Sequence, residues 1–262
     1  MISRVLKYSL IFIFFLVNNL VYSQSWCPPS VDESNRALSF DGTNDFVTIP
    51  YIFNPNDDFT VSFWFKRDDY GSGGRDIVLS QAQGNAGGSE PGRTIISSKT
   101  GANRQFSTYI SGGNKYMLQG LENGKWTHIA LVHDTDAAGG AIGQVQWYYN
   151  GIQHGNPQNV NVSSNDDGEF YLGKNPQNTQ FFKGLIDEVR IWNTTRTFAQ
   201  IQSDLHGDAN SLDPSLLVHY NMGTVTTTIL VNNSSYGATY NGVLSGGASG
   251  TLVTQNNIKL TS

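Results

Sequence analysis

The sequence has 262 residues but only one cysteine, so no disulfide bond can form within the chain. Charged residues make up only 14% of it, and Lys plus Arg (16) are outnumbered by Asp plus Glu (21). An acidic chain without basic runs repels phosphate, which excludes nucleic acid as a partner. A disordered chain would carry more charge and fewer than the 38% hydrophobic residues found here. The low charge, together with 28 glycines and 12% aromatic residues, favours a β-rich extracellular protein.

Long apolar runs are also lacking, except at residues 10–17 near the N-terminus. Arg4 and Lys7 precede this run, and residues 21–23 are of the kind that a signal peptidase accepts. A membrane anchor is the alternative, but eight apolar residues are too few for the ~20 that cross a bilayer. We predict that residues 1–23 are a secretory signal cleaved between Ser23 and Gln24. The protein is then secreted or held at the cell surface, without a membrane span.

The rest of the chain consists of short β-type runs separated by clusters of Gly, Asn, Asp and Ser. Large apolar side chains alternate with smaller ones in residues 59–65, so one face of that run should lie in a core. Residues 126–132 are apolar enough to be covered on both faces. The pair Asn150-Gly151 is a strong signal for a tight hairpin. Strands and turns at this spacing predict an all-β sandwich or jelly roll.

One segment, near residues 197–206, breaks the β pattern and predicts a short helix. Thr197 and Gln200 have the spacing of a capping box, and Gly207 stands where a left-handed residue often ends a helix. Three apolar residues at helical spacing should pack this helix on the sandwich: Phe198, Ile201 and Leu205.

Six short blocks occur in a fixed order along the chain: 37–47, 59–65, 124–130, 147–151, 172–173 and 184–193. In that order, and with the short helix after them, they resemble bacterial laminin G-like domains of the concanavalin A-like lectin/glucanase superfamily. The resemblance implies a two-sheet antiparallel jelly-roll sandwich over residues 36–222. Residues 24–35 would lead into it, and residues 223–262 would supply one or two closing strands and a poorly ordered tail.

The resemblance also implies a structural Ca²⁺, which many members of this superfamily hold. Ca²⁺ takes six to eight oxygen ligands, and an Asp-Gly turn offers a carboxylate beside backbone carbonyls. In related jelly rolls an early acid meets an acid on the last core strand, so the expected ligands are Asp41, Gly42, Asn44 and Asp187. The alternative is that Asp41 caps a turn and Asp187 pairs with an arginine.

Members of the superfamily commonly bind glycans or protein partners. Several aromatic and polar side chains are not committed to a core face by the pattern, and these are the candidate ligand contacts: Tyr70, Arg75, Arg104, Tyr109, Asn114, Tyr116, Gln119, Trp147 and Tyr148. The same aromatic residues could instead fill the space between the sheets. Nothing in their spacing identifies a sugar.

A glycoside hydrolase of this superfamily would place paired carboxylates on one strand, in a Glu-x-Asp-x-x-Glu arrangement. The chain has five glutamates, none of which begins or ends that pattern: Glu33, Glu90, Glu122, Glu169 and Glu188. We therefore expect a secreted, non-catalytic carbohydrate-binding or adhesion module stabilised by Ca²⁺. Its partner would be a polysaccharide or surface glycan, or a protein. The alternatives are a glycoside hydrolase or polysaccharide lyase, and a structural spacer of a cell-surface assembly.

Overall fold

The computed structural model describes the greater part of the predicted sandwich. The described residues are 36–50, 52, 57–68, 75–82, 93–99, 105–109, 114–117, 122–137, 139, 142–161, 168–207, 209–223, 225–226, 228–246 and 252–254. The predicted signal (1–23), the lead-in (24–35) and residues 255–262 of the predicted tail lie outside these ranges.

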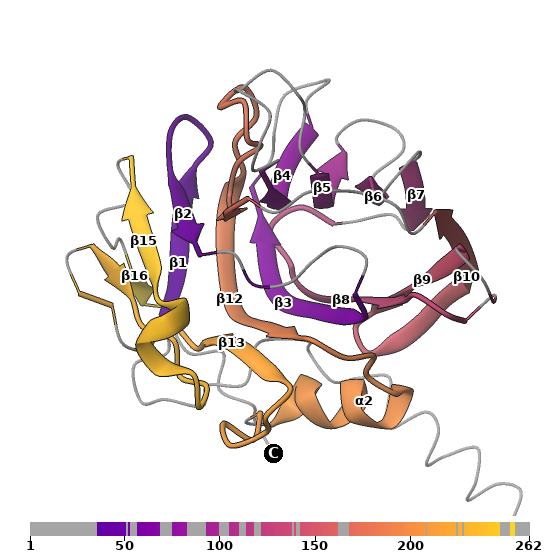
Figure 1. Cartoon of the computed structure of the whole chain (residues 1–262). Coiled ribbons are helices and arrows are strands. Elements are labelled where there is room, and N and C mark those ends of the chain that lie inside the picture. Colours follow the sequence, from indigo (N-terminus) through magenta and orange to yellow (C-terminus); the bar gives the residue numbers. More distant parts are fainter. Residues whose placement is uncertain are drawn as a thin grey trace, which may run out of the picture.

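The described strands form two antiparallel sheets that face each other (Figure 1). Sheet A runs in the order β10 (Ile152–Asn161), β9 (Ile142–Tyr149), β8 (Trp126–Asp134), β3 (Phe59–Arg67), β12 (Lys183–Trp192), β1 (Arg36–Asp41) and β16 (Leu252–Thr254), with β13 (Leu216–Tyr220) also paired to β12. Sheet B runs in the order β14 (Ile229–Leu230), β15 (Gly242–Ser245), β2 (Phe46–Ile49), β11 (Phe170–Leu172), β4 (Arg75–Gln81), β5 (Arg93–Lys99), β6 (Gln105–Tyr109) and β7 (Asn114–Met117). Consecutive strands pair in β8–β9–β10 and in β4–β5–β6–β7, whereas pairs such as β1 with β12 and β2 with β15 join distant parts of the sequence. The predicted all-β, two-sheet antiparallel sandwich is confirmed.

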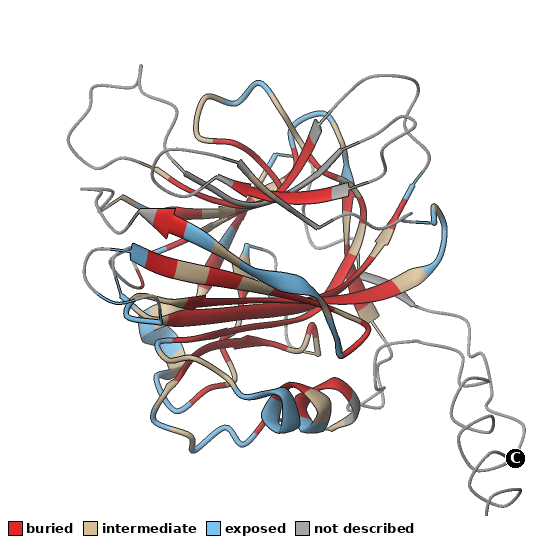
Figure 2. Cartoon of the chain, turned by 90° about the vertical axis from the view of Figure 1, so that its right-hand side faces the viewer, coloured by how far each residue is buried: buried red, intermediate tan, exposed pale blue. Residues whose placement is uncertain are grey.

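The core lies between the two sheets, as the alternation in β3 predicts. Phe59, Val61, Phe63 and Phe65 all belong to the buried cluster that fills this space. Strand β8 is buried on both faces, again as predicted, because helix α2 (Phe198–His206) covers the outer face of sheet A. Figure 2 shows the buried residues concentrated between the layers and beneath this helix.

One buried ion pair connects the two sheets. Arg67 at the end of β3 and Asp76 on β4 are both almost completely buried, and Arg67 Nε lies 3.0 Å from Asp76 Oδ2. A buried charge is tolerated only when it is paired, so each residue depends on its partner in the opposite sheet.

Strand β12 carries a β-bulge that shifts by one residue the set of side chains facing the core. Ile186 and Val189 are three residues apart, yet both lie in the core. The register to β3 shifts between Asp187 and Arg190, and Glu188 in the bulge has a φ of 51°. One extra residue in a strand turns the following side chains to the opposite face, which brings Val189 inward and Arg190 outward.

Helix α2 begins with the predicted capping box between Thr197 and Gln200. Two details differ from the expectation. Gly207 ends the helix in an extended conformation (φ −136°) because its carbonyl accepts a hydrogen bond from Arg190 Nη2 at 3.0 Å. Ile201 and Leu205 are buried as predicted, whereas Phe198 is 51% exposed. In the described part of the chain, no helix has the length and apolar character needed to cross a bilayer.

The chain continues into both sheets after residue 222. Strand β15 pairs with β2, β14 pairs with β15, and β16 pairs with β1. A short 3₁₀ helix, η2 (Gly237–Tyr240), connects β14 to β15. The described residues after 222 therefore supply three strands to the two sheets, where one or two closing strands were expected.

Candidate functional site

The predicted ligand contacts do not form one described site. Tyr70, Arg104 and Gln119 lie outside the described residues. Four others lie on sheet B strands of which the structure describes the backbone: Arg75 on β4, Tyr109 on β6, and Asn114 and Tyr116 on β7. The register places Tyr109 directly opposite Asn114 and Tyr116 opposite Ser107.

The prediction that Trp147 contacts ligand is wrong. Trp147 lies on the inner face of β9, is 1% exposed, and its ring centroid is 6.2 Å from that of Phe106 on the opposite sheet. The alternation of β9 explains the position, since Val145, Trp147 and Tyr149 share the face that packs into the core.

Replacing Trp147 by Phe should therefore change stability and leave ligand affinity unchanged. We expect the free energy of unfolding to fall by about 0.5–3 kcal/mol, because a smaller ring leaves part of the core unfilled. Urea denaturation measures this loss, and titration with a bound glycan measures the affinity. If Trp147→Phe lowers the ligand affinity as well as the stability, Trp147 belongs to the binding site after all.

The expected Ca²⁺ ligands do not come together either. The register of β1 and β12 pairs Asp41 with Lys183, which places Asp187 four residues away along the strand, or about 13 Å. Asp41 Oδ1 accepts hydrogen bonds from the backbone N–H groups of Thr43 and Asn44, at 2.7 and 3.3 Å, and so caps its own turn with Gly42. Asp187 Oδ1 accepts from the Glu188 N–H within the bulge at 2.8 Å. These four residues do not fit one metal site, and no other group of three His, Cys, Asp or Glu in the described residues does.

A row of side-chain amides occupies the outer face of the β9–β10 hairpin. We call it the amide row: Gln144, Gln146, Gln153 and Asn159. Gln144 Nε2 donates to Asn159 Oδ1 at 3.0 Å across the two strands. Two residues further along β9, Gln146 Oε1 accepts from Gln153 Nε2 at 3.2 Å, and Gln146 Nε2 donates to the His154 carbonyl at 3.0 Å. All four side chains are exposed or half-buried, so the amides are held in place and still face solvent.

The exposed ring of Phe198 extends the row. It stacks on Tyr148, with ring centroids 6.4 Å apart and an angle of 25° between the planes. Tyr148 is the next outward side chain of β9 after Gln146, and its cross-strand neighbour on β10 is Gln153. Burial beneath Phe198 and Ile201 raises the pKa of the Tyr148 phenol. Phe198 therefore presents an apolar ring next to the amides.

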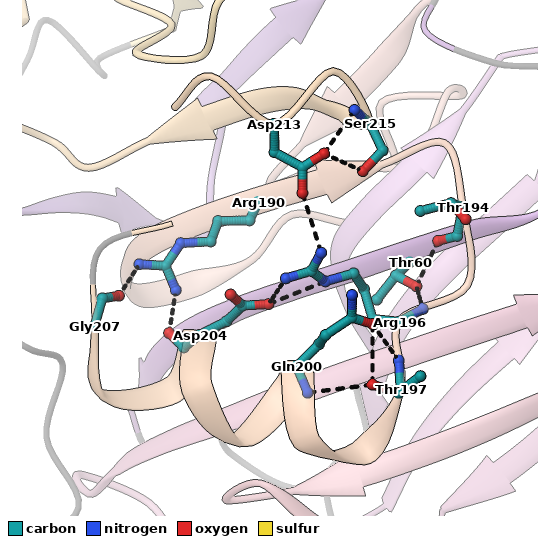
Figure 3. Close-up of polar contacts among 10 residues, drawn as sticks. All are labelled: Thr60, Arg190, Thr194, Arg196, Thr197, Gln200, Asp204, Gly207, Asp213 and Ser215. Atoms are coloured by element: carbon teal, nitrogen blue, oxygen red, sulfur yellow. Dashed lines mark hydrogen bonds and ion pairs between the residues drawn. The ribbon is translucent and has the colours of Figure 1, made fainter. Parts of the chain in front are cut away.

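Contacts in the middle and the C-terminal part of α2 hold the helix that carries Phe198. Gln202 donates to the Gly151 carbonyl in the hairpin turn, and Arg190 Nη1 donates to the Asp204 carbonyl at 2.5 Å. Arg196 pairs through Nη2 with Asp204 at 2.7 Å, and Figure 3 shows Asp204 between the two arginines. The ring is thus placed on the hairpin before any ligand arrives.

Two carboxylates mark the other end of the amide row. Asp134 lies directly opposite Gln144 on the outer face of sheet A, and the Asp136 N–H donates to Asp134 Oδ1 at 3.2 Å. Burial, and next the neighbouring Asp136 carboxyl, raise the pKa of Asp134. The site lies on the surface, with Gln153 and Asn159 exposed. A separate gap beneath α2 has no room for a water molecule; it is lined by Thr60, Ser62, His128, Trp192, Ile201 and Asp204.

The sequence contains a signal for part of this site. The alternation of β9 places Gln144 and Gln146 on the face opposite Trp147, and a two-residue turn at Asn150-Gly151 aligns Gln153 with Tyr148. Asn159 could not be found in this way. The register shifts by two residues between His154 and Gln158, so Asn159 faces Gln144 at the place where a regular hairpin would put Pro157.

Comparison with known proteins identifies the family. A sequence model described as the concanavalin A-like lectin/glucanases superfamily, of the laminin G type, matches residues 41–202, which is more than half of the chain. A search of curated proteins finds no match.

Solved structures are similar to the chain at low sequence identity, and the first of them shows the same fold. A candidate carbohydrate-binding protein from Bacteroides ovatus is 18% identical with a TM-score of 0.54, over 81% of this chain and 58% of its own length. Domain 4 of an extracellular arabinanase from Geobacillus stearothermophilus, in complex with arabinotriose, is 24% identical (TM-score 0.47; 65% of this chain, 76% of that one). A Trypanosoma rangeli sialidase is 17% identical (TM-score 0.48; 65% of this chain, 28% of that one).

Proposed function

Because the chain belongs to the concanavalin A-like lectin/glucanases superfamily, we propose that it is a non-catalytic carbohydrate-binding module whose site is the amide row with Phe198. The observation that carries the proposal is an exposed aromatic ring beside four outward-facing amides on one hairpin. Sugars present hydroxyl groups that both donate and accept hydrogen bonds, together with apolar C–H faces. A side-chain amide also donates and accepts, and an aromatic ring covers an apolar face.

Preorganisation supports the same proposal. The amides hydrogen-bond to one another across β9 and β10, so binding has little side-chain entropy to remove. Phe198 is positioned by helix α2 and by its stacking on Tyr148. The site is shallow and open, which suits a polymer lying on the surface better than a small molecule enclosed in a pocket.

The positions of the described glutamates support the non-catalytic part of the proposal. A glycoside hydrolase needs two carboxylates about 5–10 Å apart on either side of the scissile bond. Glu188 is buried beneath α2 and paired with Arg190, Glu122 pairs with Lys125, and Glu169 accepts a hydrogen bond from the Tyr171 hydroxyl at 3.2 Å. Export through the predicted signal at residues 1–23 would bring such a module into contact with extracellular polysaccharide.

The test is affinity gel electrophoresis of the purified protein against soluble polysaccharides, followed by calorimetric titration of the best ligand. Phe198→Ala and Gln153→Ala should each weaken binding about tenfold, or about 1.4 kcal/mol, because each removes a central contact of the site. The matched controls are Val243→Ala on sheet B, which removes an exposed apolar side chain, and Asn193→Ala, which removes an exposed amide after β12.

The controls should bind like the wild type. No retardation by any polysaccharide, or equal loss in the site variants and the controls, would contradict the proposal. Release of reducing sugar from a bound polysaccharide would identify an enzyme instead.

A further inference from the structure

The hairpin that carries the amide row is free of charged side chains. Strands β9 (IGQVQWYY) and β10 (IQHGNPQNVN) contain no Lys, Arg, Asp or Glu, and neither does the first turn of α2 (FAQI). The arginines nearest to α2 are engaged elsewhere: Arg190 is completely buried, and Arg196 pairs with Asp204 and Asp213. The row therefore offers no guanidinium or ammonium group to a carboxylate or sulfate.

Among the described residues, the charged side chains next to Gln144 are the carboxylates of Asp134 and Asp136, while Lys115 stands on β7, a strand of sheet B that contacts β10. Asp134 faces Gln144 directly, Asp136 follows it, and the whole chain carries a formal net charge of −5. An anionic ligand on the row would be repelled by these carboxylates without a compensating cation. A hydroxyl group, by contrast, can donate to them.

The contacts are spaced along one strand. The outward residues of β9 alternate along the strand: Gln144, Gln146 and Tyr148, on which Phe198 stacks. Neighbouring contacts therefore lie about 6.6 Å apart, and the row is about 13 Å long. That length exceeds one sugar ring. A ligand that reaches both Phe198 and Gln144 must be a chain.

We infer, on the basis of the proposed function, that the row binds a neutral polysaccharide as an extended segment lying along β9. Anionic glycans such as polyuronates and sulfated polymers are excluded from it. Recognition comes from hydroxyl–amide hydrogen bonds and ring stacking, neither of which is screened by salt.

Calorimetry on the purified protein tests the ligand class. The neutral probes are laminarin, arabinoxylan and galactomannan, and the anionic probes are polygalacturonate, alginate and chondroitin sulfate, each at 50 and 500 mM NaCl. We expect a neutral probe to bind with an affinity that differs less than about twofold between the two salt concentrations. Phe198→Ala should abolish or strongly weaken that binding.

Oligosaccharides of the bound polymer test the extended geometry. Gln144→Ala should weaken binding of a hexasaccharide roughly fivefold, close to 1 kcal/mol, and leave binding of a disaccharide at Phe198 unchanged. Equal effects on both lengths would overturn the extended segment.

The outcomes separate this inference from the proposed function. An anionic probe could bind more tightly than the neutral probes, lose affinity at 500 mM NaCl and be weakened by Phe198→Ala. That result would overturn the neutral ligand class but would still support the proposed binding site. If no probe binds, or if Phe198→Ala leaves the affinity unchanged, the proposed function is overturned and this inference with it.

Discussion

Replacing Arg190 by Met is expected to lower the free energy of unfolding by about 3–5 kcal/mol. Arg190 is 0% exposed, and its Nη2 lies 2.6 Å from Glu188 Oε2. Its other donors reach the carbonyls of Asp204 and Gly207 at the end of α2. Met fills similar space but leaves the Glu188 carboxylate buried with His219 alone, whose Nε2 is 3.0 Å away. Urea denaturation followed by tryptophan fluorescence measures the loss.

Two further variants separate charge from packing. The double variant Glu188→Gln with Arg190→Met should recover much of the loss, since it leaves no buried carboxylate without its cation. Arg196→Met is the matched control, because Arg196 makes similar contacts to α2 from a partly exposed position, and it should cost less. A single-variant loss below about 1 kcal/mol would show that the buried charge is compensated in some other way.

Asp76→Asn should have an effect of similar size, about 3–5 kcal/mol, at the opposite end of the sandwich. The substitution keeps the volume of the side chain and removes the charge that balances Arg67 between the two sheets. A buried guanidinium that loses its carboxylate keeps the cost of desolvation and loses the opposite charge that offsets it. The same denaturation experiment checks this expectation.

An exposed ion pair provides the comparison for Asp76. Glu122 and Lys125 form a surface pair with well over half of each side chain exposed, and Glu122→Gln should change stability by no more than about 0.5 kcal/mol. If Asp76→Asn were equally mild, the pair between the sheets would not hold them together.

The sequence predicts the fold well because the fold depends largely on local patterns. Alternation in residues 59–65 predicts the buried face of β3, the Asn150-Gly151 turn predicts the β9–β10 hairpin, and Thr197 with Gln200 predicts the start of α2. Each of these signals lies within a few residues of the element that it determines.

The site was harder to predict because it depends on long-range register. Asp41 and Asp187 fail as a metal pair because the pairing of β1 with β12, strands more than 140 residues apart in sequence, separates them. Asn159 reaches Gln144 only through the irregular register of β10. Phe198 has the spacing of a core residue, and only the placement of α2 on Tyr148 shows that its ring remains exposed. No local pattern contains these relations.

The pairing of β1 with β16 determines how this domain can be tethered. Arg36 lies directly opposite Thr254, so the first and the last described residues lie side by side at one edge of sheet A. The amide row lies at the other edge, four strand spacings from β1 to β9, or about 19 Å. A linkage next to Arg36 or Thr254 is therefore made at the edge of sheet A opposite the row. Copies joined in tandem could therefore engage one polymer together, and modest single-site affinities would combine into avidity.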